Sequence, residues 1–69
     1  MRSNQNFYIS LAKATNLPPH VARHHVVRMV ADVERRHNYQ LAEQIRLYPQ
    51  ELLKIFAHAI KEELMGVSD

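Results

Sequence analysis

Two histidines, His20 and His24, have the spacing of metal ligands on a helix. Residues four apart lie on the same side of an α-helix, where two imidazoles can hold one zinc ion. A zinc site needs at least a third ligand, and the chain has no cysteine and no HExxH segment to supply it. Only His37 or an acidic residue elsewhere could do so. We therefore expect surface histidines, with no metal site and no cofactor.

Basic side chains, with one acidic side chain among them, recur along one side of the segment 18–37. They are His24, His25, Arg28, Asp32, Arg35 and Arg36. A row of this kind would suit the phosphates of a nucleic acid. The pairs Arg28–Asp32 and Asp32–Arg36 could instead be ion pairs on a solvated helix face, each worth about 0.2–0.5 kcal/mol. Both interpretations stay open at this point.

Residues 11–26 resemble the helix-turn-helix of DNA-binding regulators. That motif has a small residue where its two helices touch, then a left-handed turn residue followed by an apolar residue. Ala12, Asn16 and Leu17 match these three positions, over a segment of 16 of the 69 residues. The chain departs from the motif in its asparagine in place of glycine, in Pro18-Pro19 at the start of the second helix, and in the length of that helix.

This resemblance implies a DNA-binding face on the second helix. The start of that helix would lie in the major groove, with His20, Arg23 and His24 facing bases and Val27 beside them. Lys13 and Arg28 would meet phosphates. Any two amphipathic helices joined by a short capped turn share this pattern, so an ordinary helical corner is the alternative.

The remaining residue types indicate no catalysis. No nucleophile has an evident base, and there is no glycine-rich phosphate loop and no paired carboxylates in an expected pocket. The aromatic residues could stack on single-stranded bases, but they lie on or beside apolar faces, which favours core packing. They are Phe7, Tyr8, Tyr39, Tyr48 and Phe56. We expect no enzyme and no small-molecule substrate.

Four helices in a compact all-α bundle are expected to position these residues. Glycine is scarce and apolar residues recur at spacings of three and four. Prolines suit the first turn of a helix, and Asn16 suits a left-handed cap at the end of one. The predicted helices cover residues 6–15, 18–37, 39–47 and 49–65. The alternative is one continuous helix over 18–47, because nothing at His37-Asn38 breaks a helix as firmly as proline does.

The apolar pattern also predicts which helix faces are buried. The expected inner residues are Phe7, Leu11, Ala14, Thr15, Ala22, Val26, Met29, Val30, Val33, Leu41, Ala42, Ile45, Leu52, Leu53, Ile55, Phe56, Ala59, Ile60 and Leu64. Ile9, Val27 and Ala31 lie off these faces and could contact a protein partner. Glu63 falls inside the apolar arc of its helix, which indicates looser packing there.

Length and charge limit the partners. Sixty-nine residues form a single domain, 1–69, with ends 1–5 and 66–69 expected to fray. Without cysteine, stability must come from helix packing or from a second subunit. The formal charge of +2 is too small to require a polyanion. We read no targeting or membrane-spanning segment, so a cytoplasmic protein with no membrane partner is expected.

Two functional hypotheses follow. The first is a small regulatory protein, a homodimer, that binds duplex DNA through Lys13, His20, Arg23, His24 and Arg28. The second is an adaptor or inhibitor that binds a protein partner, or a second copy of itself as a homo-oligomer, through Ile9, Val27 and Ala31. We favour the first slightly, because residues 11–26 are the one group of residues with a stated mechanism.

Overall fold

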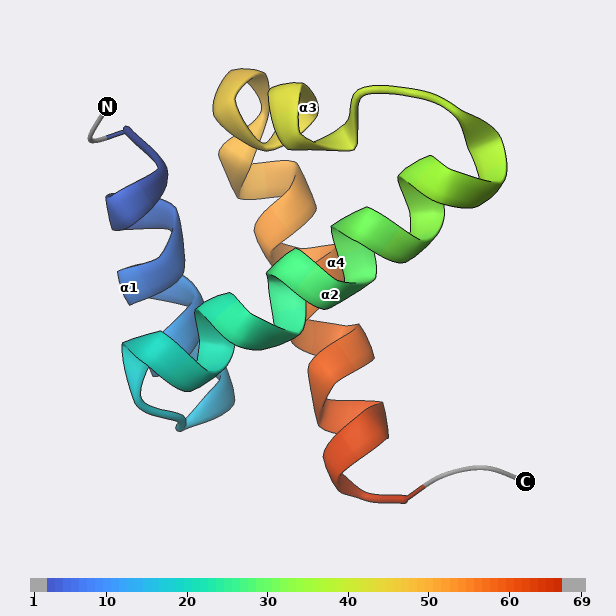
Figure 1. Ribbon diagram of the computed structural model, residues 1–69. Helices are drawn as coiled ribbons and strands as arrows, with labels where there is room; N and C mark the ends of the chain where they lie inside the picture. The colour runs from blue at the N-terminus through green and yellow to red at the C-terminus, as the bar shows by residue number, and fades with distance from the viewer. Residues whose placement is uncertain (1–2, 67–69) are drawn as a thin grey trace.

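Four α-helices make up most of residues 3–66, which are the residues that the computed structural model describes (Figure 1). They are α1 (Ser3–Thr15), α2 (Pro19–His37), α3 (Leu41–Leu47) and α4 (Pro49–Leu64). The predicted all-α fold of four helices is confirmed. No helix within the described residues combines the length and the apolar character needed to cross a membrane.

The predicted helix ends are close to the observed ones. Every end of α2, α3 and α4 falls within two residues of its predicted position. The first helix begins at Ser3 instead of Asn6, because no helix breaker precedes the first apolar residue. Residues 3–5 were expected to fray and are helical. The other expected frayed residues, apart from Gly66 at φ 69°, lie outside the described part of the chain.

Asparagines in the left-handed conformation end the first two helices. Asn16 has φ 64° and Asn38 has φ 58°. Asparagine tolerates this region better than most residues other than glycine. The N–H of Leu17 donates to the carbonyl of Ala12 across 3.0 Å, which is the bond that closes a Schellman turn. The predicted cap at Asn16 is confirmed, and the alternative of one continuous helix over 18–47 is wrong because the chain turns at Asn38.

The four helices share one core. α1 lies against both α2 and α4, and the short α3 contacts all three other helices. In Figure 1, α2 crosses in front of α4, while α3 sits at the end of the bundle where α4 begins. The buried apolar residues come from every helix: Phe7, Leu11, Ala12, Ala22, Val26, Val30, Ile45, Phe56, Ala57 and Ile60.

Several predicted inner residues are exposed. They are Ala14, Ala42, Ile55 and Leu64, together with two of the five aromatic residues, Tyr39 and Tyr48. The apolar arc of α4 is wider than the surface that its neighbours cover, so Ile55 lies outside the contact. Leu64 is exposed because the last turn of α4 extends past the other helices (Figure 1). On α1 the buried stripe includes Ala12 and leaves Ala14 on the solvent side.

Candidate nucleic-acid interface

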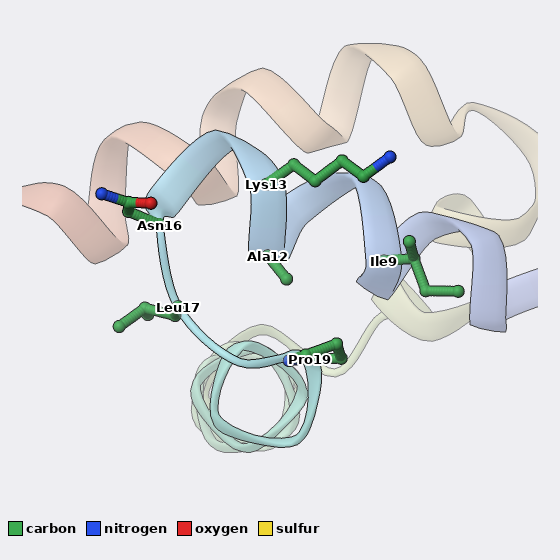
Figure 2. Close-up of a pocket in the computed structure, with 6 residues that line it drawn as sticks. All are labelled: Ile9, Ala12, Lys13, Asn16, Leu17 and Pro19. Carbon is green, nitrogen blue, oxygen red and sulfur yellow. The ribbon is translucent and has the colours of Figure 1, made fainter.

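The α1–α2 corner has the local geometry that a helix-turn-helix needs. Ala12 is only 4% exposed where the two helices meet, and Asn16 takes the left-handed turn position. Leu17 packs against the core. In Figure 2, α2 is seen along its axis while α1 lies across the picture, so the two helices cross steeply. A pocket of about 340 Å³ opens between them.

The departures from the motif are accommodated at this corner. Pro18 is the N-cap of α2 with φ −63° and ψ 150°, and Pro19 is in the first turn, so the prolines begin the helix without interrupting it. The buried hydroxyl of Thr15 donates to the carbonyl of Leu11 at 2.8 Å, which satisfies the polar group that closes α1. The length of α2, 19 residues, remains a difference from the motif.

The start of α2 is open to solvent. His20, Arg23 and His24, the residues expected to face bases, are all exposed, and Val27 beside them is 48% exposed. Lys13 is also exposed, and its side chain extends along α1 at the edge of the corner pocket (Figure 2). Lys13 forms no ion pair within residues 3–66. Four of the five predicted DNA contacts are therefore accessible on this part of the molecule.

Arg28 is engaged elsewhere. Its Nη2 lies 2.7 and 2.6 Å from the two carboxylate oxygens of Glu63 on α4. His25 Nδ1 lies 3.0 Å from Oε1 of the same carboxylate. The Arg28–Asp32 pair expected from helical spacing is absent among the ion pairs of the described residues. Glu63 was expected to mark looser packing in the apolar arc of α4. Its carboxylate instead pairs with Arg28 on α2.

The hydrogen bond from Arg28 holds the pKa of the Glu63 carboxyl below its ordinary value of 4.5, although partial burial opposes this change. A lowered folded pKa means that ionised Glu63 stabilises the fold. That contribution is complete above the ordinary pKa and disappears as pH falls through the lower folded pKa. Because both side chains are partly exposed, screening limits it to at most about 1 kcal/mol.

Glu63→Gln is therefore expected to lower the free energy of unfolding at neutral pH and to match the wild type at a pH below the folded pKa. Urea denaturation at the two pH values measures this difference. Glu62→Gln is the matched control, because within residues 3–66 the ion-pair partner of Glu62 is the exposed His58 on its own helix. Equal losses for the two variants at neutral pH would contradict a special role for the α2–α4 pair.

The C-terminal half of α2 carries ion pairs on its surface. Asp32 accepts from Arg36 at 2.8 Å and from Arg35 at 3.1 Å, which confirms the predicted Asp32–Arg36 pair. The Arg36 hydrogen bond also lowers the pKa of Asp32. All three arginines of the basic row are therefore paired with a carboxylate, and the exposed Arg23 and Lys13 near the α1–α2 turn are not, within residues 3–66.

The residues predicted to contact a protein partner do not form one surface. Val27 and Ala31 line a shallow groove of about 250 Å³ with Tyr8 and Glu34. Ile9, which is 40% exposed, lies in the pocket at the α1–α2 corner. A larger apolar groove, of about 610 Å³, lies between α2 and α4. Periodicity did not predict it, because periodicity does not say which apolar residues a neighbouring helix leaves uncovered.

One signal in the sequence adds to the candidate interface. The first 31 residues contain four of the nine lysines and arginines and none of the seven acidic residues. The remaining residues contain five and seven, so the formal charge is +4 for 1–31 and −2 for 32–69, which sum to the total of +2. Charge asymmetry of this kind is a signal for contact with nucleic acid or with a membrane surface. α1 and the first turns of α2 carry no carboxylate that would repel a phosphate.

Comparison with known proteins found no family model, no curated protein and no solved structure that matches this chain. Within residues 3–66, no three histidine or acidic side chains gather where they could hold a metal ion. The observations that bear on function are therefore those at the α1–α2 corner and in the apolar grooves.

Proposed function

We propose that this protein binds duplex DNA through the α1–α2 corner. The observation that carries the proposal is the solvent-exposed start of α2, with His20, Arg23 and His24, on a half of the chain that contains no acidic residue. An α-helix fits the major groove, where base edges present hydrogen-bond acceptors and donors. The first turns of α2 enter the groove, and Arg23 is the side chain best suited to reach a base edge.

The flanking residues have separate roles in this proposal. Lys13 contacts a phosphate, because it is exposed at the corner and unpaired within residues 3–66. Arg28 contacts no phosphate in this proposal, because its guanidinium pairs with Glu63. It stabilises the site instead, by fixing α4 to the middle of α2. Two copies on one duplex, as in the homodimer hypothesis, would double the number of phosphate contacts.

Comparison of two lysine variants tests the proposal. Binding to a fluorescent duplex is followed by anisotropy over a series of salt concentrations. Lys13→Gln should weaken binding and reduce the magnitude of the slope of log K against log salt by about 0.9 for each bound copy. Lys54→Gln removes the same charge from another exposed position, on α4, and should leave the slope unchanged. Equal effects, or no salt-dependent binding by the wild type, would contradict the proposal.

A second candidate function is protein binding, and the α2–α4 groove favours it. The groove holds about 610 Å³, and most of its lining residues are apolar, among them Tyr39, 51% exposed, and Ile55, 61% exposed. Exposed apolar surface of this kind on a small domain often marks a protein contact. In this reading a second copy of the chain covers the groove. Light scattering that reports a monomer at every concentration would count against it.

A further inference from the structure

We propose that Tyr8 is a positioning residue for Arg23. Its ring orients the Arg23 guanidinium for a bidentate contact with two neighbouring acceptor atoms on DNA. Such acceptors are the O6 and N7 atoms of guanine or two oxygens of one phosphate. The inference rests on the proposed DNA binding and adds to it a residue on α1 that no base or phosphate needs to touch.

The Tyr8 ring, which lies beneath the Arg23 guanidinium, is packed against the core. Arg23 Cζ lies 5.8 Å from the centre of the Tyr8 ring. Tyr8 is half-buried and packs edge-on against Phe7, with ring centres 5.5 Å apart and an angle of 76° between the planes. Phe7 is buried and packs edge-on against Phe56 at 6.3 Å. A row of aromatic contacts therefore runs from the core to the exposed guanidinium and restrains the ring on which it rests.

No carboxylate occupies the N–H donors of Arg23 within residues 3–66. A guanidinium interacts with an aromatic ring through its face, while its five N–H donors point outward in its plane. Arg28, Arg35, Arg36 and Arg46 each pair with a carboxylate, and Arg23 is the one arginine within residues 3–66 that does not. Its donors are available for DNA without the loss of an existing ion pair.

The Tyr8 ring preorganises the Arg23 side chain for binding. A long side chain that is free in solution loses rotamer entropy when it is fixed against a ligand, and a side chain already held in place loses less. Removing the ring should therefore weaken DNA binding about three- to tenfold. A merely structural contact between α1 and α2 would instead lower stability and leave the affinity of the folded protein unchanged.

Tyr8→Leu and Tyr8→Phe separate these two roles. Tyr8→Phe keeps the ring and should bind duplex DNA as the wild type does. Tyr8→Leu keeps apolar bulk and should lose about three- to tenfold in affinity. In an Arg23→Lys background, where the planar fork is absent, Tyr8→Leu should have no further effect. Additive losses in this double-mutant cycle would overturn the inference, because Tyr8 would then act without Arg23.

Two measurements complete the test. NMR of the free protein should show ring-current shifts on the δ-methylene protons of Arg23 in the wild type and in Tyr8→Phe, and their loss in Tyr8→Leu. Urea midpoints show whether each variant is folded. If Tyr8→Leu is not, the ring-current shifts of Arg23 in the wild type and in Tyr8→Phe carry the test, and their absence would overturn the inference. The acceptor is identified with modified duplexes. If 7-deazaguanine abolishes the difference in affinity between the wild type and Tyr8→Leu, Arg23 contacts a guanine edge. If methylphosphonate links abolish it, Arg23 contacts a phosphate.

The outcomes distinguish this inference from the proposed function. If the wild type binds DNA and Tyr8→Leu binds equally well, only the role of Tyr8 is overturned. If the wild type shows no salt-dependent binding to duplex DNA, the proposed function fails and the inference fails with it.

Discussion

Phe56→Ala is expected to lose about 3–5 kcal/mol of free energy of unfolding, the usual cost of removing a large buried ring. Phe56 is 5% exposed and meets Phe7 edge-on, so its removal leaves a cavity between α4 and α1. Small domains have a total stability of only about 5–15 kcal/mol, and this chain has no disulfide to add to it. Much of the variant should be unfolded at physiological temperature.

Ile55→Ala is the matched control for this prediction. Ile55 is the neighbouring residue on α4 but is 61% exposed, so its truncation should change the free energy of unfolding by about 0.5 kcal/mol or less. Urea denaturation followed by far-UV circular dichroism measures both variants. A Phe56→Ala protein with a wild-type midpoint would mean that α4 packs by a different face.

Ala12→Leu is expected to cost about 1–3 kcal/mol, the typical effect of forcing extra methylenes into a closely packed contact. Ala12 is buried where α1 meets the start of α2, and its side chain points toward α2 (Figure 2). The larger residue pushes α2 away from α1 and moves Arg23 and its neighbours relative to Lys13. We therefore expect the variant to lose DNA affinity as well as stability.

The control for Ala12→Leu lies two residues away on the same helix. Ala14→Leu introduces the same side chain at an exposed position and should leave both stability and DNA affinity nearly unchanged. The free energy of unfolding comes from urea titration, and affinity is measured under conditions in which both variants are folded. Tolerance of leucine at both positions would show that the two helices do not meet closely at Ala12.

The helices of this protein were predictable because their limits are set by local signals. Pro49 begins a helix through its fixed backbone angle, and Asn16 ends one through the left-handed conformation that its side chain tolerates. Residues at the centre of each apolar stripe, such as Leu11, Val26 and Ile60, were correctly expected to be buried. A 3.6-residue period is sufficient to identify the centre of a stripe.

The edges of the stripes were not predictable in the same way. Ile55 and Ala42 have the periodicity of buried residues, but their exposure depends on where α2 and α3 cross the bundle. Arg28 illustrates the same limit for charges. Local spacing favours Asp32 as its partner, whereas its carboxylate comes from Glu63, 35 residues away. A contact between distant helices depends on their crossing geometry, which no spacing within one helix contains.

The candidate site depends both on local sequence signals and on contacts between helices that are distant in the sequence. The match of Ala12 and Asn16 to a turn motif is local, and the structure gives both residues the burial and conformation that the motif needs. The exposure of the start of α2 depends on where the other helices pack, and it became known only from the structure. The position of Arg23 over the Tyr8 ring depends on the packing of α1 against α2, so the sequence alone did not suggest it.

An amide NMR titration of the protein with duplex DNA measures most directly which surface binds. We predict shifts concentrated at Lys13, His20, Arg23, His24 and Val27, and their progressive loss as salt is added. Shifts gathered along the α2–α4 groove around Ile55, or a spectrum that DNA leaves unchanged, would contradict the assignment of the α1–α2 corner as a nucleic-acid interface.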